Sequence, residues 1–148
     1  MGCSSSSHSY EIRGRVVNVS DGDTLTVLTA GNVQKKIRLA AIDAPEKKQS
    51  FGTQSKRFLE SMCRDSNAVV DVVDTDRYGR IVGFVTCNGV GVEKKMVESG
   101  MAWVYRSYAR GRADLYAAEA SARSRGEGLW ADNSTPIPPW EWRKNSPR

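Results

Sequence analysis

Four short segments of the sequence concentrate the charged side chains that could carry chemistry: Asp21–Thr24 (DGDT), Arg38, Asp43–Glu46 (DAPE) and Asp76–Arg80 (DRYGR). Carboxylate oxygens are the ligands that calcium and magnesium prefer, and a turn presents them with little strain. An arginine on a rigid strand offers a well-fixed fork for a phosphate. Taken alone, each segment is as well explained by an acidic turn, a surface ion pair or a helix cap, so only their joint occurrence points to chemistry.

Together these segments supply the parts that hydrolysis of a phosphodiester needs. The transition state concentrates negative charge on the phosphate oxygens, and a divalent cation with two arginines would offset that charge. Pro45 stiffens the DAPE segment, in which we assign Asp43 to the metal and Glu46 to the attacking water molecule. The DRYGR segment adds two cations and an aromatic ring for a nucleotide.

The composition is that of one globular domain with a basic balance of charge. The 148 residues carry a net charge of +5 and a pI of about 9.3, which favours polyanionic partners such as nucleic acid. Charge alone does not decide the matter, because many basic domains never contact nucleic acid. No apolar run approaches the ~18 residues of a membrane span, so we expect no transmembrane segment.

The cysteine spacing indicates no zinc site, and it does not decide whether the cysteines form a disulfide. Cys3, Cys63 and Cys87 fit no zinc motif, and His8 is the only histidine. Cys63 and Cys87 either pair in an exported protein or remain two buried thiols.

The pattern of apolar and turn-forming residues predicts a β-rich α+β chain. We expect strands over residues 11–19, 24–29, 33–42, 68–73 and 81–87. Helices are expected over residues 54–64, 92–99 and 115–125, the last capped by Asp114 and ended by Gly126. This order fits a five-stranded OB-fold Greek-key barrel with three α-helices.

The sequence divides into three parts. Residues 1–9 are polar and low in complexity, which favours a disordered N-terminal segment, and residues 10–132 make up the barrel domain. Residues 133–148 form a tail with four prolines and two tryptophans. We expect this tail to pack on the domain in an extended conformation, without a regular helix.

Three motifs, in this order, resemble the staphylococcal nuclease-like (thermonuclease) family. They are VSDGDTLTV from Val19, KKIRLAAIDAPE from Lys35 and DTDRYGRIVGFV from Asp74, followed by GLW at residues 128–130. The resemblance covers roughly residues 11–130. It implies the OB barrel with three helices, in agreement with the order of elements.

The resemblance also implies a catalytic and a metal-binding set. Arg38, Glu46 and Arg80 match the family's catalytic arginine, glutamate and arginine. Asp23 and Asp43 match its calcium-binding carboxylates, and the backbone carbonyl of Ala44 would be a further ligand.

Four further positions match the family less directly. Asp21 matches an acidic position that supports the metal loop. Arg77 and Tyr78 match a pair that holds a terminal phosphate and nucleotide, and Tyr105 lies near later nucleotide-contacting tyrosines.

The activity so implied is calcium-dependent cleavage of DNA and RNA, in which water attacks phosphorus and leaves 3′-phosphate and 5′-hydroxyl ends. We expect a monomer that needs no stable protein partner. We also expect a secreted or periplasmic protein, because an unrestrained nuclease would endanger its own cell. A lipid anchor at Gly2 or Cys3 is an alternative at the N-terminus.

Two other classes of function stay open at this point. A catalytically inactive nucleic-acid-binding module would keep the barrel and lose the side chains of the site. All five of these side chains are present here: Asp23, Arg38, Asp43, Glu46 and Arg80. A basic structural or peptide-binding domain would use the tail and would gain no thermal stability from calcium with a nucleotide bisphosphate.

Overall fold

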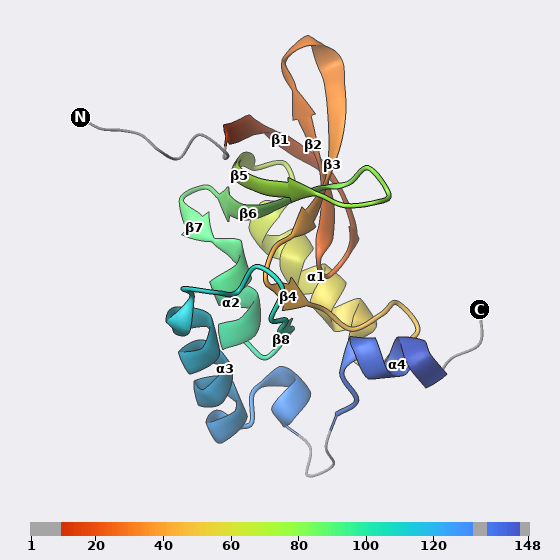
Figure 1. The fold of residues 1–148 in the computed structure, drawn as a ribbon, viewed down its shortest axis with the longest axis vertical. Coiled ribbons are helices and arrows are strands. Elements are labelled where there is room, and N and C mark those ends of the chain that lie inside the picture. The colour runs from red at the N-terminus through yellow and green to blue at the C-terminus, as the bar shows by residue number, and fades with distance from the viewer. Residues whose placement is uncertain (1–9, 132–135, 146–148) are drawn as a thin grey trace.

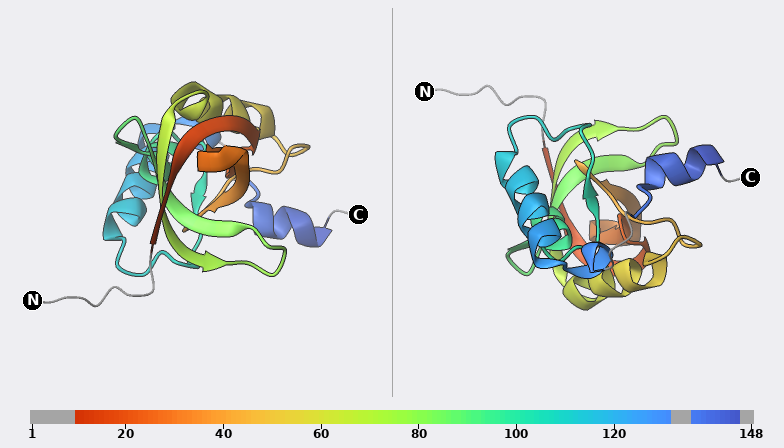
Figure 2. Two further views of the ribbon diagram at one scale, coloured as in Figure 1. Left: turned by 90° about the horizontal axis from the view of Figure 1, so that it is seen from above. Right: turned by 90° about the horizontal axis from the view of Figure 1, so that it is seen from below.

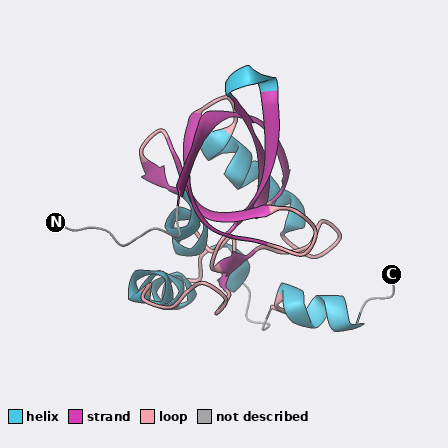
Figure 3. Ribbon diagram, turned by 45° about the horizontal axis from the view of Figure 1, so that its top comes forward, coloured by secondary structure: helices cyan, strands magenta, loops and turns pink. Residues whose placement is uncertain are grey.

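The computed structural model describes residues 10–131 and 136–145. Five strands form its barrel: β1 (Tyr10–Asp21), β2 (Thr24–Thr29), β3 (Val33–Leu39), β5 (Asn67–Thr75) and β6 (Ile81–Cys87). They are hydrogen-bonded in the order β3-β2-β1-β5-β6, and a parallel pairing of β3 with β6 closes the ring, which Figure 3 shows obliquely with the top tilted forward. The predicted five-stranded OB-fold barrel is therefore confirmed.

Alternation of side chains along each strand explains why the sheet closes. On β3, Ile37 and Leu39 are buried inside the barrel, while Arg38 between them points to the other face. The other strands fill the interior with fully buried aliphatic side chains, and a register shift in β1 lets both Val16 and Val19 face inward; these residues are Val16, Val19, Leu25, Val27, Val70 and Val85. Closure pairs the edge strands β3 and β6 with each other over residues 37–39 and 81–83, so that part of each strand is not left exposed.

The predicted strand over residues 33–42 is interrupted. Ala41 adopts a left-handed backbone with φ 68°, which ends β3 at Leu39 and turns the chain out of the barrel. The next two residues form β4 (Ile42–Asp43), which pairs with β8 (Trp103–Val104) in a separate small sheet. The turn places Asp43 at the mouth of the barrel.

The helices lie beside the barrel and, in the view of Figure 1, below it. These are α1 (Gly52–Cys63), α2 (Val92–Glu98), α3 (Ala113–Arg125) and α4 (Pro139–Asn145). The views of Figure 2 place α3 and α4 on opposite sides of the barrel. Short elements complete the fold: β7 (Val90–Gly91) and the 3₁₀ turns η1 (Ala30–Asn32) and η2 (Gly128–Trp130).

The fourth helix contradicts the prediction of an extended tail. The prolines of the tail do not interrupt α4: Pro136 and Pro138 precede the helix, and Pro139 is its first residue, where a missing N–H costs nothing. The carbonyl of Pro138 accepts hydrogen bonds from the amides of Glu141 and Trp142, which begins the helix. Residues 10–131 and 136–145 thus contain four α-helices, one more than the three predicted.

The end of α3 agrees with the prediction and its start does not. Gly126 closes the helix in the left-handed conformation, and its amide bonds back to the carbonyls of Ala122 and Arg123. Asp114 lies inside the first turn and is not its cap; its carboxylate instead forms two hydrogen bonds of 2.9 Å with Arg112.

The structure joins Cys63, the last residue of α1, to Cys87, the last residue of β6, in a disulfide. The described residues contain no helix that is long and apolar enough to cross a membrane. The predicted disorder of residues 1–9 lies outside the described residues.

Candidate functional site

The turn between β1 and β2 holds the first carboxylates of the site. The amide of Asp23 donates to Asp21 Oδ1 at 3.1 Å, which fixes the turn. Asp23 is 8% exposed, and its Oδ2 accepts a hydrogen bond of 2.8 Å from the amide of Ala44. This bond ties the first acidic segment to the DAPE segment, 21 residues further along the chain.

Arg38 stands beside this turn because β2 and β3 pair Thr24 with Arg38. Its Nη1 donates to the carbonyls of Leu39 at 2.7 Å and Ile42 at 2.9 Å. Its Nη2 lies 3.4 Å from Asp43 Oδ1, and its Nη1 lies 3.7 Å from Asp23 Oδ2. The guanidinium is therefore held by the backbone and bridges the two carboxylates.

Arg80 reaches the same mouth from the β5–β6 hairpin. It directly precedes Ile81, which pairs with Ile37 across the parallel β3–β6 contact. Asp76 Oδ2 accepts a 2.7 Å hydrogen bond from Arg80 Nε, and Asp76 Oδ1 accepts from the amides of Tyr78 and Arg80. The loop thus holds Arg80 through Nε, which leaves the Nη end of the guanidinium for a ligand.

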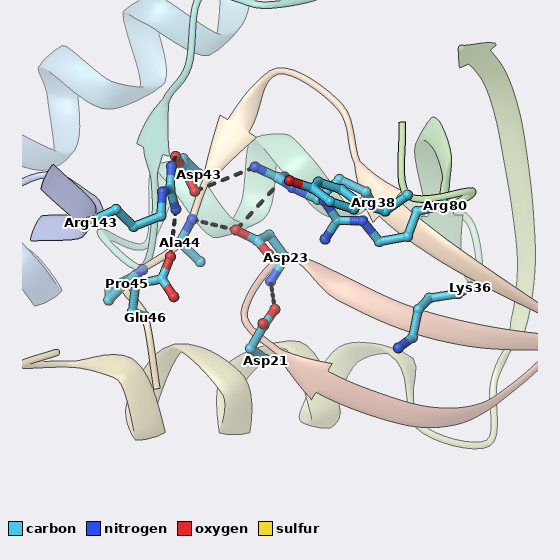
Figure 4. A pocket seen from close by; sticks show the side chains of 11 residues that line it. Asp21, Asp23, Lys36, Arg38, Asp43, Ala44, Pro45, Glu46, Arg80 and Arg143 are labelled. Atoms are coloured by element: carbon cyan, nitrogen blue, oxygen red, sulfur yellow. Dashed lines mark hydrogen bonds and ion pairs between the residues drawn. The ribbon is translucent and has the colours of Figure 1, made fainter. Parts of the chain in front are cut away.

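These segments enclose one cavity of about 640 Å³, shown in Figure 4. Its lining residues are Asp21, Asp23, Lys36, Arg38, Asp43, Ala44, Pro45, Glu46, Tyr78, Arg80 and Arg143. All the side chains predicted to be catalytic, and both predicted metal-binding carboxylates, are among them. These side chains come from the β1–β2 turn, β3, β4 with the segment that follows it, and the β5–β6 hairpin.

Burial and crowding perturb the three aspartates. Burial, followed by the charge of Asp23, raises the pKa of Asp21 to about 7. Burial also raises the pKa of Asp43 to about 6, although Arg143 and Arg38 oppose this. Burial opposes ionisation of Asp23 too, but Arg38 and the hydrogen bonds it accepts hold its pKa below the ordinary value. A cation beside these carboxylates would offset their mutual repulsion.

The donor chemistry of the cluster fits a hard cation. The carboxylates offer oxygen ligands alone, and Asp23 lies between Asp21 and Asp43 in Figure 4. Calcium takes six to eight such oxygens. Within the described residues, however, no group of three or more His, Cys, Asp or Glu side chains is already arranged to hold a metal ion. Asp43 directs its Oδ1 to Arg38 and its Oδ2 to Arg143 instead.

The predicted substrate-binding residues lie at different distances from this centre. Tyr78 lines the cavity with 75% of its surface exposed, and the guanidinium groups of Arg77 and Arg80 lie 5.9 and 5.8 Å from its ring centroid. Arg77 does not line the cavity. Tyr105 lines a smaller neighbouring pocket of about 160 Å³, together with Arg38 and Arg80.

Sequence reasoning missed two lining residues. Lys36 is two residues before Arg38 on β3 and points the same way in Figure 4, a placement that strand periodicity could have indicated. Arg143 arrives from α4, 100 residues from Asp43 and 97 from Glu46. Nothing in the local sequence indicates that contact.

The fold and the cavity define a class: an OB-fold barrel whose mouth combines buried carboxylates with fixed arginines, suited to a polyanion and a cation. The family model described as "Staphylococcal nuclease homologue" matches residues 36–132. The chain therefore belongs to the staphylococcal nuclease family.

Several bacterial proteins are similar to this chain over most of its length. It is 46% identical over 130 residues to an "Uncharacterized endonuclease" of Haemophilus influenzae, across 88% of this chain and 72% of that protein. It is 40% identical over 146 residues to "Protein ParB" of Escherichia coli, across 92% and 81% of the two chains. A "Micrococcal nuclease" of Shigella flexneri is 37% identical over 147 residues, across 92% and 83%.

Proposed function

We propose that this protein is a calcium-dependent nuclease that hydrolyses phosphodiester bonds of DNA and RNA, leaving 3′-phosphate and 5′-hydroxyl ends. The nuclease activity itself is supported by membership of the family and by relatives named as endonuclease and micrococcal nuclease. The observation that carries the finer proposal is the meeting of Asp23, Arg38, Asp43, Glu46 and Arg80 in one cavity.

Each residue has a role that its position supports. Arg38 is fixed by two carbonyls and Arg80 by Asp76, so both present preorganised positive charge to a phosphate without reorganising during the reaction. Glu46 is a carboxylate whose side chain is 39% exposed at the cavity, so it can take a proton from a water molecule held beside the phosphorus. Bound calcium would hold the phosphate oxygens and offset their charge. Asp23 and Asp43, with the carbonyl of Ala44 and support from Asp21, would hold that ion.

Nucleotide contact is the role we give to the periphery of the cavity. The exposed ring of Tyr78, flanked by the guanidinium groups of Arg77 and Arg80, offers a surface for a base or a terminal phosphate. Tyr105 offers a second ring in the adjoining pocket. The charged side chains of this arrangement would contact phosphates, which DNA and RNA share, so we include both among the substrates.

A calcium-titrated digest with analysis of the product ends tests the proposal. We expect plasmid DNA and single-stranded RNA to be cut in calcium, with 3′-phosphate ends, and to stay intact with excess chelator. Glu46→Gln should lower the rate by about 10²–10⁴, while Glu11→Gln, an exposed glutamate at the start of β1, should cut like the parent. Tight binding of an oligonucleotide without cleavage in calcium would favour a silent binding module instead.

We further propose that the protein is exported to an oxidising compartment. The Cys63–Cys87 disulfide supports this, since such bonds persist outside the reducing cytosol. Cell fractionation followed by thiol alkylation and mass spectrometry tests it: we expect the protein outside the cytoplasm with both cysteines protected. Recovery in the cytosol with both thiols alkylated would contradict it.

A further inference from the structure

The tail helix α4 inserts a guanidinium into the acidic side of the cavity. Arg143 Nη2 lies 2.8 Å from Asp43 Oδ2, and Arg143 Nη1 donates to Glu46 Oε2. Both ends of the Arg143 fork are thus placed on carboxylates, as Figure 4 shows. The Asp43 side chain is 1% exposed and the Arg143 side chain is 35% exposed, so the carboxylate of this pair is desolvated while the guanidinium keeps partial contact with solvent.

Aromatic contacts hold the tail in this position independently of charge. The ring of Trp140 lies 5.5 Å from that of Tyr105 and 6.4 Å from that of Trp103, measured between centroids. Trp103 is on β8, the partner strand of β4, and pairs directly with Asp43. The tail therefore also covers Tyr105, which we assign to substrate.

A hydrogen-bonded link connects the tail to the segment that carries Glu46. Gln49 Nε2 donates to the carbonyl of Ile137, just before α4, while Gln49 Oε1 accepts a 3.0 Å hydrogen bond from the amide of Glu46. The tail thus contacts side chains that flank Glu46 in the sequence: Asp43 before it and Gln49 after it. Residues 137–143 therefore contact the acidic side of the cavity in three ways: by ion pairs, by aromatic contacts and by a hydrogen bond.

The position of Arg143 distinguishes a competitor from a substrate ligand. Arg38 and Arg80, which we assign to the phosphate, are anchored by groups outside the proposed cation and water sites: two backbone carbonyls hold Arg38, and Asp76 holds Arg80. Arg143 donates to Asp43 and Glu46, the carboxylates that the proposed function assigns to the cation and to the water. Because Arg38 contacts one oxygen of Asp43 and Arg143 contacts the other, a cation that binds Asp43 must compete with the positive charge of Arg143.

We propose that α4 is an autoinhibitory latch, in which Arg143 competes with the divalent cation for Asp43, holds Glu46, and lets Trp140 cover Tyr105. This inference rests on the proposed calcium-dependent function. A ligand that binds only the open form shows an apparent affinity reduced by the open fraction, so a latch closed for 90% of the time weakens calcium binding about tenfold. Coupling is reciprocal: calcium must open the latch to the same degree that the latch weakens calcium.

Titration calorimetry of the full chain with calcium chloride alone tests the latch. We expect Arg143→Gln to lower the calcium Kd about tenfold or more relative to the parent. Lys144→Gln, the next residue of the same helix with a side chain 71% exposed, should leave the Kd unchanged. Trp140→Ala, which loosens the latch without changing any charge near the cation, should lower the Kd in the same direction.

Amide hydrogen exchange of residues 139–145 provides the second measurement, which needs no catalysis. Added calcium should speed exchange of α4 in the parent, because it displaces the helix. An Arg143→Gln chain that binds calcium with the parent's Kd, or more weakly, would overturn the latch while leaving the nuclease proposal intact. Absence of calcium binding in both chains would overturn the two proposals together.

Discussion

The Asp21→Asn substitution should stabilise the metal-free protein while weakening its response to calcium. Burial and the neighbouring Asp23 raise the pKa of Asp21 from 3.8 to about 7. Between these two pH values the folded protein keeps a proton that the unfolded chain has released, so the stability of the parent falls as the pH rises from 4 to 7. Asparagine removes that loss, and its Oδ1 can still accept the hydrogen bond from the amide of Asp23.

The size of this effect follows from the pKa difference. The step from 3.8 to about 7 corresponds to at most about 4 kcal/mol at 1.36 kcal/mol per pH unit. Asp21 is only partly buried, and solvent screening reduces the figure to about 2 kcal/mol. The gain should be present in full at pH 8 and absent at pH 4.

Urea denaturation with chelator present, at pH 4 and pH 8, measures the gain. Asp71→Asn makes the same change of charge at an exposed position of β5 and should stay within about 0.5 kcal/mol of the parent. In excess calcium the order should reverse, since calcium stabilises the parent more than the variant. An Asp21→Asn chain that is no more stable than the parent at pH 8 with chelator would refute the argument that these carboxylates are kept for a cation.

Three further outcomes follow from contacts elsewhere in the fold. Burial raises the pKa of Glu93 to about 8, so the parent should lose stability as the pH rises from 4.5 to 8. Glu93→Gln should remove that loss, because glutamine can still accept the hydrogen bond from the Val85 amide. Urea midpoints at pH 5 and 8.5 check this, and an equal change of midpoint with pH in parent and variant would contradict it. Reduction of the Cys63–Cys87 disulfide, whose cysteines are 24 residues apart, should lower the free energy of unfolding by about 3 kcal/mol, measured by denaturation with and without reductant; an unchanged midpoint would contradict it. Asp76→Asn should slow cleavage about tenfold or more through misplacement of Arg80, measured as initial rates beside Asp71→Asn; a parental rate would exclude that positioning role.

Local patterns in the sequence specified most of the barrel. The strands over residues 24–29 and 81–87 were predicted with their observed bounds, because alternating β-branched residues between turn signals leave little choice. The helix over residues 54–64 was predicted within two residues of α1, since its apolar positions recur at helical spacing. These signals act over a few neighbouring residues.

Features that depend on distant contacts were not predictable in the same way. The left-handed Ala41 that ends β3 has no side-chain signature, because alanine is not a residue that favours this conformation. The pairing of Cys63 with Cys87 stayed open because spacing does not give connectivity. The tail helix was missed because the prolines were taken to exclude it, whereas Pro136 and Pro138 precede it and Pro139 is its first residue.

The sequence predicted which residues form the candidate site, but it did not predict that Arg143 contacts two of them. Types and order of residues indicated Asp23, Arg38, Asp43, Glu46 and Arg80, and the barrel topology brings them to one cavity. The roles given to them remain predictions. The Arg143 contact joins residues about a hundred positions apart, and no local pattern encodes such a pairing.

The most direct test of the account is a crystal structure of the protein with calcium and a nucleotide bisphosphate. The account predicts one calcium ion coordinated by Asp23 and Asp43, a phosphate contacted by Arg38 and Arg80, and Arg143 withdrawn from both carboxylates. A calcium ion bound away from Asp23, or a phosphate that neither arginine contacts, would contradict it.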